Sequence, residues 1–230
     1  MLILREFTLS DTESCSYIPE NNSRYEYFLA ADLNEDELDV VLRSGWRKFG
    51  WYYFRPRCDG CASCVPVRVP VNSFSPSKSQ RRVIRKNMGV RARIRPLNYS
   101  DEVYDIYCEH SRDRFHKEAS MPDFMFNFYQ VSCPAAQSEY YLGGRLMAVG
   151  FLDVSARALS TVYFVYRSEF SVYSPGIFSV IREIEFARDM GKEYYYLGYY
   201  VAECPRMRYK NTFRPAEKYS WDEKKWLVGA

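Results

Sequence analysis

Three cysteines within a seven-residue segment constrain this chain more than any other feature of its sequence. Cys58, Cys61 and Cys64 stand at two successive two-residue spacings, and sulfurs at such spacings can converge on one metal ion or cluster. The segment lacks the second knuckle of a zinc ribbon, and Arg68 occupies the place of the fourth ligand in a ferredoxin-type run. Cys15 is the best candidate for a fourth thiol, brought in by folding. We therefore predict a zinc or iron–sulfur site at Cys15, Cys58, Cys61 and Cys64, with free thiols in a tight loop as the alternative.

The composition is that of a folded protein from a reducing compartment. Apolar residues make up 47% of the chain and charged residues 27%, which excludes a disordered or fibrous protein. The seven cysteines follow no secretory signal, so metal binding or reactivity is favoured over disulfides. The apolar opening Met1-Leu2-Ile3-Leu4 ends at Arg5, and no later run approaches the roughly 20 residues that a membrane span needs. We expect a cytoplasmic protein without a membrane segment.

Local patterns in the first half predict a helix and a strand. Asn34 is a good N-cap with Glu37 three positions on, and Gly45 follows as a stop, so residues 35–44 are expected to be helical. Alternating valines predict a strand over residues 65–71, and its prolines should confine it to a sheet edge because proline cannot donate a ladder hydrogen bond.

The remaining patterns predict an α+β fold with two domains. Pro96 ends a predicted strand at 90–95, and we place the domain boundary there, giving domains 1–96 and 97–230. The second domain should contain helices at 101–117 and after Pro122, strands at 139–154 and 158–167, a helix at 177–190 and a strand at 194–200. Helices, antiparallel strands, a helix and a strand in this order are typical of α+β layering.

A basic stripe is predicted on the helix at 77–87. Lys78, Arg81, Arg82 and Arg85 fall on one side of that helix, and between Lys78 and Arg95 there are eight basic residues and no acidic one. Such a stripe could follow a phosphate backbone. The alternative is a solvated face, and spacing alone does not decide between them.

A second group of cations follows the tyrosine-rich strand. Arg208 and Lys210 flank Tyr209, and such a cluster could hold an anion through charge-assisted hydrogen bonds, or lie exposed on a connecting turn. His110 and His116, six positions apart, do not have the four-residue spacing of paired zinc ligands. With no other histidine in the chain, covalent nucleophilic catalysis is not expected.

Read together, these motifs resemble the aminoacyl-tRNA protein transferases, in particular the bacterial aspartate/glutamate leucyltransferases related to eukaryotic arginyltransferase. In the first half the resemblance rests on Cys15-Ser-Tyr-Ile-Pro, Gly45-Trp-Arg-Lys-Phe-Gly50, Tyr53-Phe-Arg-Pro-Arg-Cys-Asp-Gly-Cys61, Cys64-Val-Pro-Val-Arg68 and Phe74-Ser-Pro-Ser-Lys-Ser-Gln-Arg-Arg82. In the second half it rests on Tyr163-Phe-Val-Tyr166, Phe178-Ser-Val-Ile-Arg-Glu-Ile-Glu185, Tyr196-Leu-Gly-Tyr-Tyr200 and Met207-Arg-Tyr-Lys-Asn-Thr-Phe-Arg-Pro-Ala-Glu217.

The resemblance implies a small N-terminal domain that carries the cysteines and a C-terminal domain with an acetyltransferase-like (GNAT-like) fold. It also implies transfer of leucine from leucyl-tRNA, with arginine from arginyl-tRNA left open, to proteins beginning with Asp or Glu, which marks them for degradation by the N-end rule. Acetyltransferases of that fold cradle a pyrophosphate on a glycine-rich turn before the central helix. Here that turn offers only Gly176 behind Pro175, which favours a tRNA donor over coenzyme A.

Site roles follow from the expected chemistry. Glu183, Tyr196 and Tyr200 are candidates for removing a proton from the attacking amine, and Arg208 and Lys210 for holding the acceptor's carboxylate. The basic stripe is the candidate tRNA contact, and no cofactor is expected to be obligatory for the chemistry. Rival interpretations are an acyl-CoA-dependent N-acetyltransferase and a metal-containing RNA-binding regulator.

Overall fold

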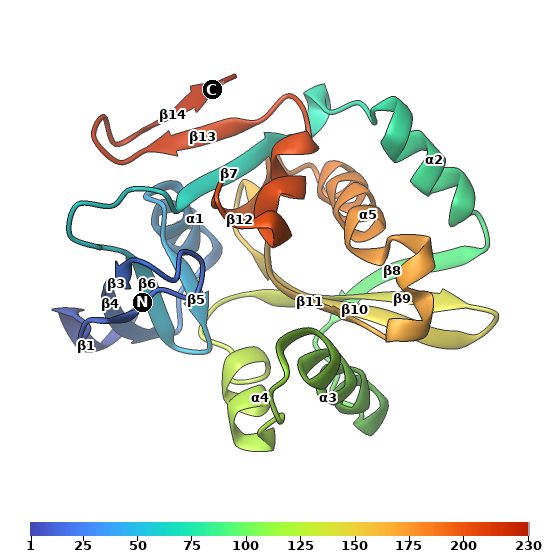
Figure 1. Ribbon diagram of the computed structural model, residues 1–230, viewed down its shortest axis with the longest axis horizontal. Coiled ribbons are helices and arrows are strands. Elements are labelled where there is room, and N and C mark those ends of the chain that lie inside the picture. Colours follow the sequence, from blue (N-terminus) through green and yellow to red (C-terminus); the bar gives the residue numbers. More distant parts are fainter. Residues whose placement is uncertain (230) are drawn as a thin grey trace.

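Two β-sheets of unequal size organise the chain. The computed structural model describes residues 1–229 and shows a mixed α/β protein with a large central sheet (Figure 1). Eight strands form that sheet, four form a second sheet at the N-terminal end, and a short two-stranded ribbon joins β2 (Glu13–Ser14) to β3 (Asn22–Ser23).

The four-stranded sheet and one helix make the N-terminal layer. Its strand order is β1–β4–β6–β5, and α1 packs on it through a core that includes Phe28, Leu38 and Tyr53. The predicted cap of α1 is confirmed, because the Asn34 side chain accepts from the Glu37 amide and Glu37 reaches back to Asn34. The elements are β1 (Leu2–Leu9), β4 (Tyr25–Ala31), α1 (Glu35–Arg43), β5 (Arg47–Phe49) and β6 (Tyr52–Pro56).

The large sheet has the order β14–β13–β7–β12–β11–β10–β9–β8. Its neighbours run antiparallel except β11 and β12, which are parallel and joined by the crossover helix α5. The strands are β7 (Val65–Pro70), β8 (Val90–Pro96), β9 (Ala135–Leu142), β10 (Arg145–Val154), β11 (Ala158–Tyr166), β12 (Tyr194–Tyr200), β13 (Glu217–Ser220) and β14 (Lys225–Val228).

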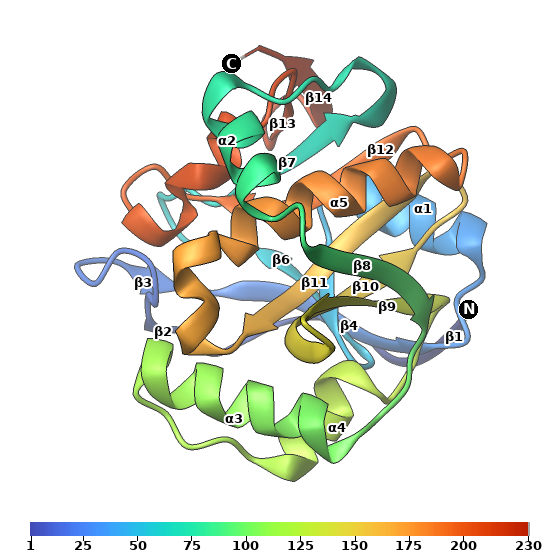
Figure 2. The same ribbon diagram turned by 90° about the vertical axis from the view of Figure 1, so that its right-hand side faces the viewer.

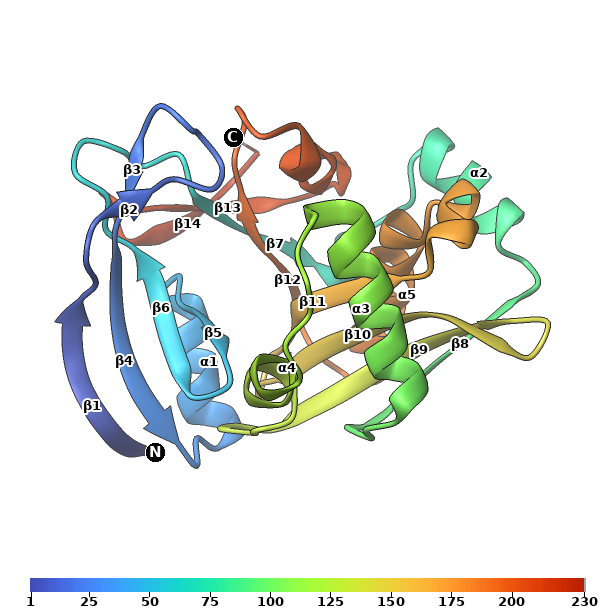
Figure 3. The same cartoon turned by 60° about the horizontal axis from the view of Figure 1, so that its bottom comes forward.

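Helices cover both faces of the large sheet. α5 (Pro175–Asp189) and α2 (Lys78–Lys86) lie over one face, and α3 (Asp101–Phe115) and α4 (Met121–Phe128) over the other (Figures 2 and 3). The α5 face is filled by residues such as Ile181, Ile184 and Leu197, and the α3 face by residues such as Ile106 and Phe124. In the part of the chain that the structure describes there are also three short 3-10 segments, at Val71–Ser73 (η1), Ser168–Tyr173 (η2) and Pro205–Thr212 (η3).

The position predicted for β7 is wrong, although the strand itself is confirmed. β7 is internal, because it pairs with β12 on one side and with β13 on the other. Its pairing with β13 involves only Val67 and Arg68, which lie between Pro66 and Pro70. The prolines therefore limit the length of the second ladder instead of preventing it.

Strands from both sides of the predicted domain boundary share the large sheet. β7 and β8 precede residue 97 and pair with β12 and β9 from the second half. The two predicted domains are therefore joined through one sheet. Among the helices of residues 1–229, none is long and apolar enough to cross a bilayer.

Candidate active site

The pairing of β12 with its neighbours in the large sheet is interrupted near Gly198. The parallel pairing with β11 covers Ala158–Ser160 and Tyr194–Tyr196, and both strands continue beyond it. The register of β12 against β7 shifts between Tyr196 and Gly198, and Gly198 has a φ of +80°. A side chain at this position would be strained. Glycine therefore lets β12 turn away from β11 at this point.

Two cationic side chains meet at this break. An added Cβ at Gly198 would lie 3.4 Å from Lys210 Nζ and 3.6 Å from Arg47 Nη2. Lys210, in η3, donates to the Tyr199 carbonyl at 2.8 Å. Arg47, in β5, donates through Nη1 to Ser160 Oγ at 2.6 Å. Elements far apart in the sequence thus bring the two charges to one point.

The two cations lack a carboxylate of their own. Within residues 1–229, neither Arg47 nor Lys210 forms an ion pair with Asp or Glu. The carboxylate whose charge reaches Arg47 is Asp153, which is already paired with Lys48 Nζ at 3.1 Å. Part-buried charges without a partner are costly. This arrangement is therefore suited to receive an anion from outside the chain.

Burial lowers the pKa of both groups, but it changes the protonation near neutral pH of Lys210 only. Enclosure of its ammonium, together with the neighbouring Arg47 charge, lowers the pKa of Lys210 to about 7. Burial also lowers the pKa of Arg47, but a guanidinium begins so far above neutrality that it stays charged. Near neutral pH, Arg47 is a permanent cation and Lys210 is close to its midpoint.

Glu183 has hydrogen-bond partners other than these cations. It is 1% exposed, in the middle of α5, and accepts hydrogen bonds from Ser138 Oγ at 2.8 Å, Tyr140 OH at 3.1 Å and Tyr195 OH. Burial raises the pKa of its carboxyl group. Glu183 is thus the centre of a closed hydroxyl network.

The structure does not bring the three predicted catalytic residues together. Tyr196 packs in the N-terminal core, and its hydroxyl accepts from Arg68 Nη1 at 3.1 Å. Tyr200 packs at the rim of the core beneath α5, with Lys218 Nζ 5.2 Å from its ring centre. Glu183 therefore shares hydrogen bonds with Tyr195, not with Tyr196 or Tyr200.

The predicted anion-binding cations separate as well. Arg208 is exposed, and its Nε donates to the Ala202 carbonyl at 2.9 Å, within the turn that leads from β12 to η3. Lys210 is directed inward to Gly198. Sequence reasoning missed Arg47, although this residue stands inside the quoted motif Gly45-Trp-Arg-Lys-Phe-Gly50.

The thiols gather near this site without forming a metal site. Burial, together with the charges of Cys58, Cys15 and Cys61, raises the pKa of Cys64 to about 12. Cys58 Sγ accepts from the Arg24 amide at 3.4 Å. Within residues 1–229, no three His, Cys, Asp or Glu side chains are placed to hold one metal ion. The thiols as they lie do not fit a zinc or iron–sulfur centre, and the predicted metal remains a prediction.

The basic stripe lies on the outer face of α2. Its residues are all exposed, while Gln80 on the opposite side of the helix is buried. Arg81 Nη1 donates to the Pro76 carbonyl at 2.6 Å. The predicted stripe is therefore available to a partner, and it consists of Lys78, Arg81, Arg82 and Arg85.

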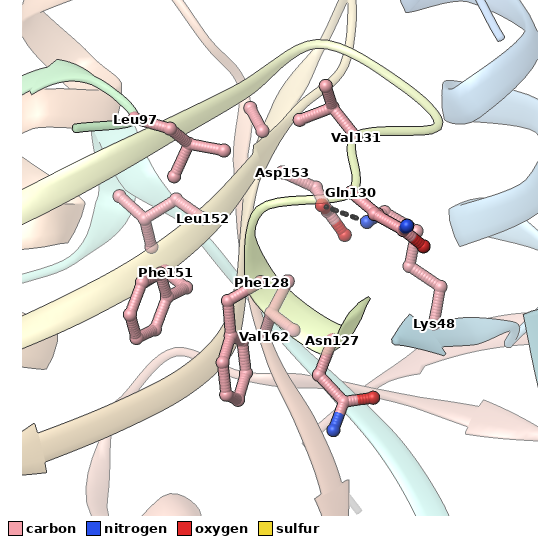
Figure 4. A pocket seen from close by; sticks show the side chains of 11 residues that line it. Lys48, Leu97, Asn127, Phe128, Gln130, Val131, Phe151, Leu152, Asp153 and Val162 are labelled. Atoms are coloured by element: carbon pink, nitrogen blue, oxygen red, sulfur yellow. Dashed lines mark ion pairs between the residues drawn. The ribbon is translucent and has the colours of Figure 1, made fainter. Parts of the chain in front are cut away.

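Neither of two cavities in the molecule offers a better substrate site. One, between Lys48, Asp153 and Phe128 (Figure 4), has a volume of about 10 Å³, enough for roughly one water molecule. The other, about 270 Å³, is a polar surface hollow beside Cys58 and Cys61. We therefore place the candidate active site at Gly198, between Arg47 and Lys210.

Comparisons with known proteins cover nearly the whole chain. Residues 13–82 match the family model of the arginine-tRNA-protein transferase N terminus, and residues 101–220 match that of its C terminus. The aspartate/glutamate leucyltransferase of Chromobacterium violaceum is 34% identical over 88% of this chain and 86% of its own length. The enzyme of the same name from Campylobacter jejuni (serotype O:6) is 32% identical over 94% and 93%.

A solved structure supports the fold alone. It is the C-terminal domain of a protein named as a lysylphosphatidylglycerol synthetase from Agrobacterium fabrum. The match has a TM-score of 0.50 at 14% identity and covers 83% of this chain and 62% of that one, less than two thirds of its length.

Proposed function

The chain belongs to the arginine-tRNA-protein transferase family, and we propose that it transfers leucine from leucyl-tRNA to proteins beginning with Asp or Glu. Both relatives described above carry the name of that activity. A protein extended in this way enters the N-end rule degradation pathway. Because aminoacyl-tRNA is a cytoplasmic substrate, the proposal places the reaction in the cytoplasm.

The observation that carries the acceptor specificity is the unpaired cation pair at Gly198. A carboxylate that enters a part-buried site loses hydration, which only a paired charge can replace. Arg47 is held in place by Ser160 and stays charged, so we assign to it the acidic side chain of the acceptor. Lys210 lies beside it, and exposed Arg208 can contact the acceptor only at the rim of the site.

The donor side of the proposal rests on α2 and on the start of α5. The exposed stripe on α2 supplies cations for tRNA phosphates. α5 opens with Pro175 and Gly176, and proline has no amide hydrogen to offer a pyrophosphate. This supports a tRNA donor over an acyl-CoA donor.

The proposal also assigns parts to the two halves of the chain. Residues 1–96 would form the small N-terminal unit with the cysteines, and residues 97–230 the acetyltransferase-like catalytic unit. The crossover β11–α5–β12 supports the second assignment, since Gly198 and Lys210 lie in residues 97–230. The first unit adds Arg47 to the site and strands β7 and β8 to the large sheet.

The reaction makes modest chemical demands. Aminolysis of an aminoacyl ester is downhill, so ATP is not required, and the enzyme has mainly to position the amine against the ester carbonyl. No metal is required for that step.

A transfer assay tests the proposal directly. The protein is incubated with labelled leucyl-tRNA or arginyl-tRNA and with peptides that begin with Asp, Glu, Asn or Ala. We expect leucine on the Asp and Glu peptides and little on the Asn and Ala peptides. Transfer from acetyl-CoA instead, or tRNA binding without any transfer, would replace the proposal by one of its two rivals.

A further inference from the structure

The proposed reaction requires a base. The attacking α-amino group has a pKa of about 7.7 to 8.0, so much of it carries a proton at neutral pH. Glu183 is closed off by Ser138, Tyr140 and Tyr195, and it lies on the α5 side of the sheet. The hydroxyl of Tyr196 is engaged by Arg68. The catalytic residues predicted from the sequence leave this proton without an obvious acceptor.

We propose that Lys210 is the catalytic base, and that its Nζ takes the proton from the acceptor's amine while Arg47 holds the acceptor's carboxylate. This assignment rests on the proposed function. It adds a base to the transfer and separates two roles that the sequence assigned jointly to Arg208 and Lys210.

The geometry matches the substrate. Asp carries its α-amino group and its side-chain carboxylate on adjacent carbon atoms, so both can meet two neighbouring groups at once. Lys210 Nζ and Arg47 Nη2 are such neighbours, since both lie within 3.6 Å of the point above Gly198. Gly198 itself has no side chain that would fill this point.

The hydrogen bonds of the two groups support separate roles. Arg47 donates to Ser160 Oγ and to the Thr161 carbonyl, so its guanidinium is fixed to β11. Lys210 Nζ has one donor committed, to the Tyr199 carbonyl. A neutral lysine amine can keep that bond and still offer its lone pair to a proton.

The surroundings of Lys210 hold its pKa near neutral pH. The charged and titratable groups that act on it are Arg47 on β5, Cys204 before η3 and Cys64 before β7. Burial, together with Arg47, lowers its pKa to about 7, and a base is most effective when its pKa lies near the working pH. Burial moves lysines into this range readily.

The step balances as follows. Lys210 Nζ takes one proton from the acceptor's ammonium group, and the free amine then attacks the ester carbonyl carbon. A carbon–nitrogen bond forms, and the bond from that carbon to the ribose oxygen of the tRNA breaks. The second amine proton is transferred to the departing ribose oxygen, and Lys210 releases its proton to solvent before the next turnover.

Charge-preserving and charge-removing variants separate a base from a mere cation. Lys210→Met should lower kcat about 10² to 10⁴-fold and abolish a rising limb of the pH profile centred near 7. Lys210→Arg keeps the charge but cannot act as a base, so it should be equally slow. A Lys210→Arg variant with near wild-type kcat would overturn the proposal. Lys210→Ala should recover activity in proportion to added methylamine, and a lack of recovery in a folded variant would count against it.

A second measurement uses the unaltered chain and needs no transfer activity. The rate at which Lys210 is acetylated by acetic anhydride is followed against pH by peptide mass spectrometry. We expect a midpoint near 7 for Lys210, well below the value of about 10.4 for a lysine in a model peptide. A midpoint near 10 for Lys210 would refute its role as the base, whatever the donor or acceptor proves to be. Absent leucine transfer with a midpoint near 7 would instead refute the proposed function.

Discussion

The hydroxyl of Tyr195 donates a hydrogen bond to Glu183, and both side chains are almost fully enclosed. The bond joins the middle of α5 to the strand that follows it. An added Cβ at Gly150 would lie 2.8 Å from Glu183 Oε1, so the sheet keeps a glycine where the carboxyl group needs room. The pair fixes β12 just before it turns away from β11, and this sets the position of Gly198.

Glu183 should therefore matter for stability. Glu183→Ala would remove the acceptor shared by the buried hydroxyl groups of Ser138 and Tyr195 and by that of Tyr140, which also reaches the Ser179 carbonyl at 3.4 Å. The cost should be at least about 2 kcal/mol in the free energy of unfolding. The matched control is Glu185→Ala on the same helix, where Arg182 provides a part-exposed partner, and its effect should stay within about 0.5 kcal/mol. Urea denaturation of both variants checks this, and equal losses would contradict it.

The same carboxyl group predicts a pH dependence. Burial raises the pKa of Glu183, so the folded chain keeps a proton that the unfolded chain loses above about pH 4.3. The free energy of unfolding should therefore fall as pH rises from about 4.3 through the raised folded-state pKa. Glu183→Gln cannot titrate and should lack this fall. Parallel pH curves for the two proteins would contradict the assignment.

The tyrosine-rich strand shows what sequence could and could not predict. The bounds of β12 are confirmed, because a run of aromatic residues is a strong strand signal. Successive side chains point to opposite faces, so only one of Tyr195 and Tyr196 can face Glu183. Which one depends on the face that α5 covers, and no local pattern contains that information.

Arg47 illustrates the same limit at longer range. It donates a hydrogen bond to Ser160, which is 113 positions away in the sequence. It comes near Lys210 because both side chains lie beside Gly198 in β12. Lys210 could be chosen from the sequence, because its motif marked it. Arg47 could be identified as its neighbour only from the structure, in which β5 lies beside β11.

The exposed stripe on α2 should control tRNA affinity. A variant with all four cations replaced by Ala should bind tRNA more weakly, and its log–log salt slope should shrink by up to about one for each cation removed. A control variant makes the same charge change at exposed sites elsewhere, and both are compared by filter binding between low and physiological salt. An unchanged slope in the α2 variant would mean that the stripe is merely solvated. The replaced residues are Lys78, Arg81, Arg82 and Arg85 in the test variant, and Arg43, Lys117, Lys224 and Lys225 in the control.

Removal of metal ions tests the thiol loop. Since the proposed step uses a base and a fixed cation, leucine transfer should survive treatment with a strong chelator. Metal analysis before and after treatment shows whether Cys15, Cys58, Cys61 and Cys64 held iron or zinc in protein purified without oxygen. Loss of both metal and activity, repeated in Cys61→Ser but not in Cys108→Ser, would show that the thiols hold a metal the enzyme needs.

Arg47 should select the acidic acceptor. A charge-assisted hydrogen bond contributes roughly 1.5 to 3 kcal/mol, so Arg47→Met should lower transfer to an Asp-initiated peptide about tenfold to a hundredfold. Replacing the acceptor's Asp by Asn should have a similar effect on the unaltered enzyme. Each change removes one half of the same pair, so the two losses should not add.

Binding of leucyl-tRNA should hardly change in Arg47→Met, because the donor's proposed contacts lie on α2. The control is Arg43→Met at the exposed end of α1, which should affect the binding of neither substrate. kcat/KM measured for the four combinations of enzyme and peptide gives the coupling energy directly. Full additivity would mean that the carboxylate binds elsewhere, with the exposed Arg208 at the rim as the next residue to replace. A coupling energy close to the loss caused by either change alone would show that the acidic side chain binds to Arg47. Because Arg47 and Lys210 both lie beside Gly198, it would also place the acceptor's amine beside Lys210.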